Sequence, residues 1–312
     1  MFKTVPPETD PVIYAIPFFL ILIFIELYIN WKEQLHLYEP KEALSSIGMG
    51  LGSLVVDIAM KGLAYGGYTY LHQYSLFPSL APSDAEFFTM QWHLSHWWVW
   101  VLLLFADDFT FYWHHRLSHE IRVLWAAHVN HHSSQTINFA TALRQSWVEQ
   151  LYKFFWWIWL PLVGFHPLMM LMMMSLSLIY QYWPHTELIK KMPRWFEFIF
   201  NTPSHHRVHH ASNIRYLDCN HGGILIIWDR LFGTFSEEQI TEKPIYGITK
   251  NINTYNLFKI AFHEYGDLWQ DVKMAPTFSD KLKYIFYPPG WSHAGEDLRA
   301  KTLRKKLLQN ES

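Results

Sequence analysis

Four long stretches of this 312-residue chain carry almost no charged side chains, and they limit the folds open to it. A helix that crosses the hydrocarbon core of a bilayer needs about 20 mostly apolar residues. The stretches near 11–29, 44–71, 87–106 and 154–183 have that character. A soluble helical core rarely supplies so many runs of this kind, so we expect an integral, multi-pass membrane protein.

Two of these stretches contain interruptions that shape the expectation. Asp57 and Lys61 lie four residues apart in the second stretch, so their side chains can pair on one face of a helix. Pro161, Gly164 and Pro167 break the fourth stretch and favour two apolar helices joined by a tight turn. The expected fold class is therefore all-α, with about four to five membrane helices.

Polar residues gather in the segments 114–153 and 187–312, which we expect to form a histidine-rich helical lobe within a single domain, 1–312. Lys and Arg number 25 and Asp and Glu number 27, so no basic field indicates a nucleic-acid partner. Basic residues near the C-terminus favour the cytoplasmic side for this lobe, at either the plasma membrane or the endoplasmic reticulum. Residues 233–250 fit a small hairpin or an irregular cap.

Histidines form three dense clusters beside the apolar stretches. Residues i, i+3 and i+4 of a helix share a face, so each cluster can point at one place. A lone histidine is more often a hydrogen-bonded core residue, but repeated clusters would repel one another when protonated unless a metal held them neutral. Together with a separate His185, they exceed what one ion can use and suit two ions side by side. The clusters are His115 and His119, then His128, His131 and His132, and then His206, His209 and His210.

The composition limits which metals and which reactions fit these clusters. The single cysteine, Cys219, excludes a disulfide framework and any cysteine-held zinc or iron–sulfur site. A hydrolytic zinc site usually keeps three protein ligands and a water, far fewer than the histidines here. A pair of iron ions with an open position can split O2 and attack an unactivated C–H bond, and the apolar stretches indicate a lipid substrate that enters from the bilayer. A membrane transport protein without catalysis would need more charges in its apolar runs than this chain has.

Carboxylates near the first cluster could orient its histidines from behind, or they could simply be helix-end charges. These candidates are Asp107, Asp108 and Glu120.

The histidine clusters resemble the histidine boxes of the fatty acid hydroxylase/sterol desaturase superfamily. The sequence segments 141–146, 180–187, 201–210 and 225–235 add to this resemblance. These segments are similar to the glyceryl-ether (alkylglycerol) monooxygenase branch. The resemblance implies a multi-pass helical protein with a di-iron centre on the cytoplasmic face. Its implied ligands are His115, His119, His128, His131, His132, His185, His206, His209 and His210.

The same resemblance implies O2-dependent hydroxylation of the ether-linked carbon of an alkylglycerol, which releases a fatty aldehyde, with tetrahydrobiopterin as the electron donor. The alternative is a sterol or fatty acyl hydroxylase or desaturase of the same superfamily, fed by a ferredoxin or a small cytochrome. Two positions are left open. His205 fills a motif position without an assigned metal, and His221 stands where the family usually has an aromatic residue, as an extra ligand or a hydrogen-bonding substitute.

Overall fold

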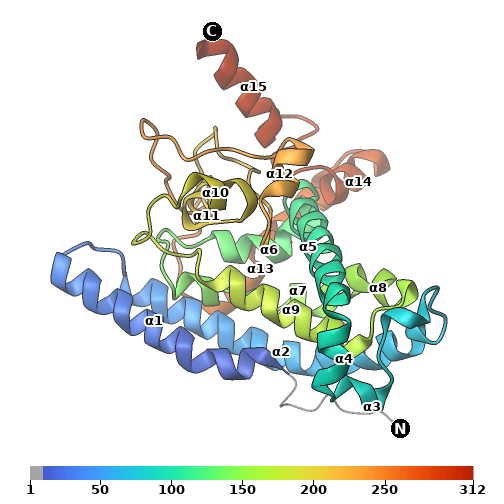
Figure 1. Cartoon of the computed structure of the whole chain (residues 1–312). Helices are drawn as coiled ribbons and strands as arrows, with labels where there is room; N and C mark the ends of the chain where they lie inside the picture. The colour runs from blue at the N-terminus through green and yellow to red at the C-terminus, as the bar shows by residue number, and fades with distance from the viewer. Residues whose placement is uncertain (1–9, 312) are drawn as a thin grey trace.

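The computed structural model describes residues 10–311, which are built from helices (Figure 1). Residues 1–9 and 312 of the expected domain lie outside the described residues. The described part has no strand, only two isolated bridges, Phe200–Leu225 and Ala211–Tyr246. The all-α prediction is therefore confirmed, and residues 233–250 form an irregular cap rather than a hairpin.

The longer helices position the rest of the chain, and short helices connect them. The longer ones are α1 (Pro11–Glu33), α2 (Pro40–His72), α5 (Trp97–Glu120), α6 (Arg122–His132), α9 (Pro167–Tyr182), α13 (Leu257–Met274), α14 (Phe278–Phe286) and α15 (Ala300–Glu311). The short ones are α3 (Asp84–Phe87), α4 (Met90–Ser95), α7 (Glu149–Tyr152), α8 (Trp159–Val163), α10 (Arg194–Ile199), α11 (Pro203–His209) and α12 (Ile227–Phe232), with the 3-10 turns η2 (Pro78–Leu80), η3 (Thr141–Leu143) and η4 (Lys153–Trp157).

Helices α1 and α2 are long and apolar enough to cross a membrane. Few of their residues are buried, and large apolar side chains stand exposed, including Phe18 and Phe24 on α1, which are 65% and 67% exposed, and Val55 on α2, which is 71% exposed. Apolar surface of this extent is unfavourable in water and favourable in lipid.

The other two predicted spans are not single long helices. Residues 87–106 run from the end of α3 through α4 into the first half of α5. Residues 154–183 divide into η4, α8 and α9, and Gly164 ends α8 with a φ of 136° before Pro167 begins α9. The tight turn predicted there is confirmed. Among the described helices, α1 and α2 alone qualify as spans by length and composition, so the count of four to five stays a prediction.

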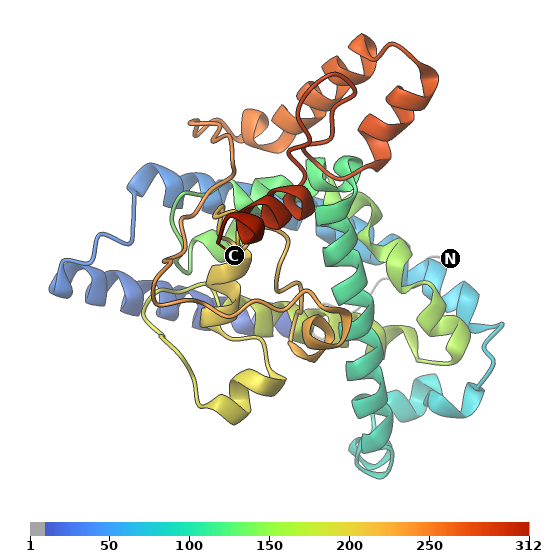
Figure 2. The ribbon, with the colours of Figure 1, turned by 90° about the horizontal axis from the view of Figure 1, so that it is seen from above.

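Helix α9 packs against both α1 and α2, and α5 crosses this layer and rises into the polar lobe (Figures 1 and 2). One apolar core joins α2, α5 and α9, through residues such as Tyr68, Leu103 and Met170. The upper end of α5 then meets α6, and α6 in turn packs on α13. The core therefore holds the apolar layer and the histidine-bearing lobe in one fixed relation.

Charged groups on α2 are neutralised by close partners. The predicted pair forms, with Lys61 Nζ 3.1 Å from Asp57 Oδ2. Lys61 also reaches Asp10 at 2.7 Å, and Lys153 reaches Asp57 at 2.9 Å. Two cations and two carboxylates therefore cancel where α2 passes the start of α1.

A separate, buried ion pair between Arg144 and Glu42 fixes the histidine-bearing end of α6 on α2. Arg144 is fully buried and donates from Nη1 to Glu42 Oε2 at 3.2 Å and to Ser45 Oγ at 2.8 Å. Its Nε donates to the carbonyl of Asn130 at 3.0 Å, next to His131. Removing one partner of such a pair leaves an uncompensated buried charge.

We expect Glu42→Ala to lower the free energy of unfolding by about 3 kcal/mol, because it leaves the Arg144 guanidinium buried without its carboxylate. Thermal unfolding of the detergent-solubilised protein measures this. The control is Lys32→Ala, whose ion pair with Glu33 is exposed and should contribute little. Equal unfolding temperatures for the two variants would contradict a structural role for the Glu42–Arg144 pair.

Candidate metal centre

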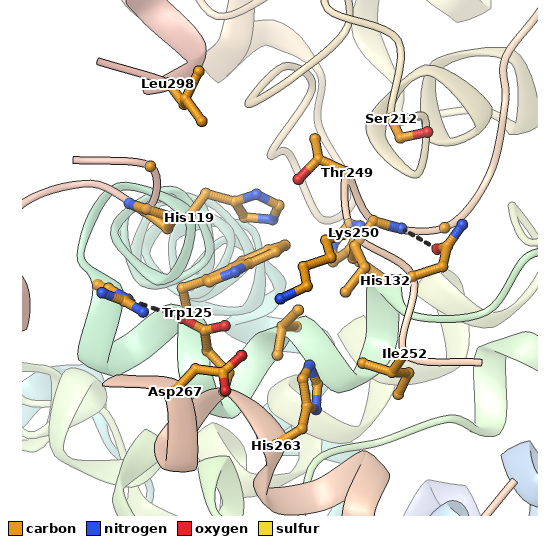
Figure 3. Close-up of a pocket in the computed structure, with 18 of the residues that line it drawn as sticks. His119, Trp125, His132, Ser212, Thr249, Lys250, Ile252, His263, Asp267 and Leu298 are labelled. Atoms are coloured by element: carbon orange, nitrogen blue, oxygen red, sulfur yellow. Dashed lines mark hydrogen bonds and ion pairs between the residues drawn. The ribbon is translucent and has the colours of Figure 1, made fainter. Parts of the chain in front are cut away.

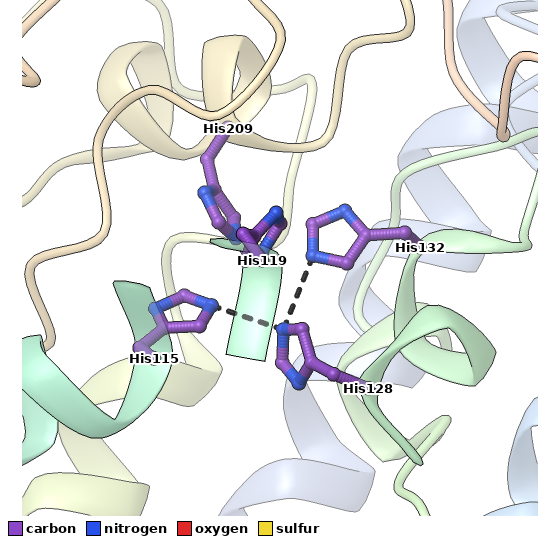
Figure 4. A group of neighbouring side chains, drawn as sticks. All are labelled: His115, His119, His128, His132 and His209. Atoms are coloured by element: carbon purple, nitrogen blue, oxygen red, sulfur yellow. Dashed lines mark hydrogen bonds between the residues drawn. The ribbon is translucent and has the colours of Figure 1, made fainter. Parts of the chain in front are cut away.

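All nine histidines that the resemblance implies as ligands converge at one buried place. They form two groups, and the ligand nitrogens of each group lie within 4.8 Å of one another. Figure 4 shows the larger group, whose rings come from α5, α6 and α11 and point toward one another. The third cluster folds back onto the first two, as expected. The larger group is His115, His119, His128, His132 and His209, and the smaller is His131, His185, His206 and His210.

Helical spacing explains how one helix can contribute histidines to both groups. Residues at i and i+4 lie on one face, so His128 and His132 enter the same group. The intervening His131 points around the helix into the other group. On α11 the same logic sends His206 and His210 to one group and His209 to the other.

Hydrogen bonds to the backbone fix the protonation of several rings. A carbonyl oxygen can only accept, so an imidazole Nδ1 beside one must carry the proton and leave Nε2 with a free lone pair. His115 Nδ1 lies 2.8 Å from the His221 carbonyl, and His209 Nδ1 lies 2.9 Å from that of Cys219. In the smaller group, His131 and His185 donate in the same way to the carbonyls of Arg144 and Gln181.

Some of these lone pairs therefore face each other. His131 Nε2 and His185 Nε2 are 3.2 Å apart, although each ring donates through Nδ1 elsewhere. His115 Nε2 and His128 Nε2 are 3.0 Å apart, and His128 Nδ1 lies 3.1 Å from Glu149 Oε2. Two nitrogen lone pairs at this distance repel unless a cation lies between or beside them. The donor set fits a metal ion in each group.

Other ring nitrogens at the centre have no protein partner among the described residues. His119 Nε2 and His209 Nε2, in the larger group, are buried and unbonded. A buried polar atom without a partner costs free energy, and metal coordination would satisfy both.

Burial lowers the pKa of His115, His119, His131, His132, His206, His209 and His210, and the neighbouring imidazoles lower it further. The pKa of His185 falls to about 4, and those of His119 and His132 fall well below the ordinary value. These eight rings are therefore neutral near pH 7, which is the form that binds a metal.

Sequence reasoning missed the carboxylate that orients a histidine of this centre. Glu149, at the start of α7, accepts from His128 Nδ1 and lies 3.6 Å from His114 Nε2. Burial by itself would raise the pKa of Glu149, but the adjacent His128 brings it to about 2. No periodicity marks this residue, because only the packing of α7 on α6 brings it to the site.

The carboxylates suggested from the sequence bind elsewhere, so that suggestion is corrected. Asp107 accepts from Trp157 Nε1 at 2.7 Å, and Glu120 pairs with Arg116. Asp108 accepts from the backbone amides of Ile224 and Leu225 and so anchors the segment that follows His221.

His205 and His221, whose roles the sequence left unassigned, lie outside both groups. The ring of His205 packs on Phe235, and its carbonyl accepts from Asn220. The ring of His221 stands 5.0 Å from that of His119, centre to centre, with both nitrogens unbonded among the described residues. Its backbone carbonyl, rather than its ring, orients His115.

Known proteins share this histidine-bearing region. A family model described as fatty acid hydroxylase matches residues 100–234, which contain all nine histidines. Alkylglycerol monooxygenases from Xenopus tropicalis and Homo sapiens are 38% and 37% identical to the chain, each over 93% of it. The chain spans only 61% and 62% of the length of these relatives.

An ornithine lipid hydroxylase from Rhizobium tropici is 30% identical over 52% of the chain and 49% of its own length. No solved structure matches the chain.

We expect the metal-free protein to lose stability as the pH falls from 7 to 5. Histidines of the unfolded chain, with a pKa near 6.5, take up protons between pH 7 and 5, whereas the buried rings with a lowered pKa stay neutral. Proton uptake therefore stabilises the unfolded state relative to the folded state. Each histidine contributes at most about 1.4 kcal/mol per pH unit. Four buried carboxyl groups act in the opposite sense, because burial raises the pKa of Asp107 to about 8, of Asp218 to about 7 and of Asp108 and Asp229 to about 6, but they are fewer than the eight histidines of the centre with a lowered pKa. Denaturant unfolding at several pH values measures the effect, and a constant midpoint would contradict it.

We expect Glu149→Gln to weaken iron binding by about 10-fold to 100-fold, because His128 loses the carboxylate that orients its ring. Competition with a chelator followed by metal analysis measures the affinity. Glu237→Gln serves as the control, since Glu237 is exposed and pairs only with Lys191. Unchanged iron affinity in Glu149→Gln would show that the carboxylate has no part in holding the ring.

Proposed function

Because residues 100–234 match the fatty acid hydroxylase family model, we propose that the chain is an O2-dependent lipid monooxygenase of the glyceryl-ether type. The observation that carries the proposal is the close facing of ring nitrogens, at 3.0 Å between His115 Nε2 and His128 Nε2 and at 3.2 Å between His131 Nε2 and His185 Nε2. Such pairs favour two cations, one in each histidine group.

We propose iron for both ions, held by the five and the four histidines of the two groups. Iron bound there would supply the oxidant that inserts one oxygen atom of O2 into a C–H bond. The chain itself fixes the ring orientations through the carbonyls behind Nδ1 and through Glu149. All nine rings are buried, which limits bulk water at the reacting centre.

The substrate class follows from the relatives named alkylglycerol monooxygenase. We propose an alkylglycerol whose ether-linked carbon is hydroxylated. The product is a hemiacetal, which breaks its bond to the glycerol oxygen and releases a fatty aldehyde and glycerol. The alternative, a sterol or fatty acyl hydroxylase or desaturase, has less support, because the relatives that cover most of the chain carry the glyceryl-ether name.

We propose that the protein is an integral membrane enzyme. Helices α1 and α2 would span the bilayer, and the lipid would reach the centre from the apolar layer formed with α9. The histidine lobe would then face the cytoplasm, at the plasma membrane or the endoplasmic reticulum. The electron donor would be tetrahydrobiopterin, or a ferredoxin or small cytochrome.

We expect His131→Ala to abolish aldehyde release and to lower bound iron, because it removes one of four nitrogens in the smaller group. Purified protein is given labelled alkylglycerol with each donor, and iron is counted per chain by elemental analysis. The control is His36→Asn, a histidine outside both groups at a positive φ that asparagine tolerates. Full iron and full turnover in His131→Ala would refute the assignment of this ligand, and no aldehyde from the parent protein with any donor would refute the function.

A further inference from the structure

A large cleft opens onto the histidine centre from the side of the C-terminal helices. Its volume is about 1310 Å³, and it lies between α6, α13 and the segments 247–254 and 289–300. His119, His132 and His209 of the larger group and His210 of the smaller group line it. None of its lining residues, within the described part of the chain, comes from α1, α2 or α9. The cleft therefore reaches the centre by a different route from the apolar layer.

The walls of the cleft suit a polar ligand rather than a lipid chain. Figure 3 shows Lys250 and Asp267 pointing into the cleft beside Trp125. Neither charged group makes a hydrogen bond or an ion pair with another described residue. In contrast, the nearby Arg122 is held by Glu264 and Asp271. An acyl chain would leave the charges of Lys250 and Asp267 desolvated without partners, whereas a polar heterocycle could bond to both.

Trp125 connects the cleft to the histidines. Its ring lies 5.0 Å from that of His119 and 5.6 Å from that of His132, centre to centre. A flat molecule stacked on the cleft side of this indole would be one aromatic ring away from two members of the larger group. A protein donor would stay outside, because the histidines that line the cleft are buried.

We propose that this cleft is the binding site of a small, flat, water-soluble reductant, stacked on Trp125 and held by Asp267 and Lys250. The inference rests on the proposed function, which requires such a donor. Hydroxylation of a C–H bond by O2 consumes two electrons and two protons, and it yields one hydroxyl group on the lipid and one water. The reductant supplies the two electrons and leaves oxidised by that amount. Asp267 pairs with its N–H donors, and Lys250 pairs with its acceptors.

Calorimetric titration of the iron-loaded full chain with tetrahydrobiopterin, without O2 or lipid, tests the site. We expect the parent protein to bind the pterin, and Asp267→Asn and Lys250→Gln each to weaken binding by about tenfold, as loss of a charged hydrogen bond does. Trp125→Ala should weaken it similarly and Trp125→Phe less, since phenylalanine keeps a stacking face. The control is Lys273→Gln, which removes a lysine of α13 outside the cleft and should bind as the parent does.

Turnover of labelled alkylglycerol with tetrahydrobiopterin or with reduced ferredoxin separates the two proposals. Weaker binding in the cleft variants, with unchanged iron content, supports the site. Equal binding by parent and variants, no binding by the parent, or turnover with ferredoxin alone overturns it. If the parent releases no aldehyde with either donor while the variants still lose pterin binding, the glyceryl-ether function fails and the site stands.

Discussion

The structure depends on the burial of nine imidazoles at one place, where ring nitrogens with free lone pairs face one another. His131 and His185 illustrate the constraint, because each donates its Nδ1 proton to a backbone carbonyl and directs Nε2 at the other. Burial keeps the rings uncharged, so proton uptake is not the favoured way to relieve the repulsion. Metal coordination is the remaining way, and it turns an unfavourable contact between nitrogens into a binding site.

The surrounding charges hold this arrangement in place from outside. Arg144 joins α2 to the end of α6, while its carbonyl accepts from His131. Asp108 anchors the backbone that follows His221, whose carbonyl orients His115. Each of these residues acts on a histidine of the centre through the backbone, which resists displacement better than a flexible side chain does. Glu149 is the exception, since its carboxylate bonds to His128 directly.

Two surfaces of different chemistry meet at the centre, and the proposed reaction uses both. The layer of α1, α2 and α9 offers exposed apolar side chains, which suit a membrane and a lipid substrate. The cleft beside Trp125 offers unpaired charges, which suit a soluble reductant. Separate routes would let the reductant reach the centre while the acyl chain remains in the apolar layer.

The sequence by itself determined the helical class and how the histidines of each cluster are placed around a helix, because both follow from local periodicity, whereas the full set of nine was implied by the resemblance. Spacing of three and four residues places His128, His131 and His132 on adjoining faces of one helix whatever surrounds it. Only the tertiary structure decided how the rings divide between two groups and which residues hold them from outside. Glu149, the Glu42–Arg144 pair and the cleft at Trp125 arise where segments far apart in the chain pack together. The extent of the apolar helices was also decided there, since α5 begins within a predicted span and ends among the histidines. Hydropathy along a chain reports which residues avoid water, and it does not report where a helix breaks to satisfy its neighbours.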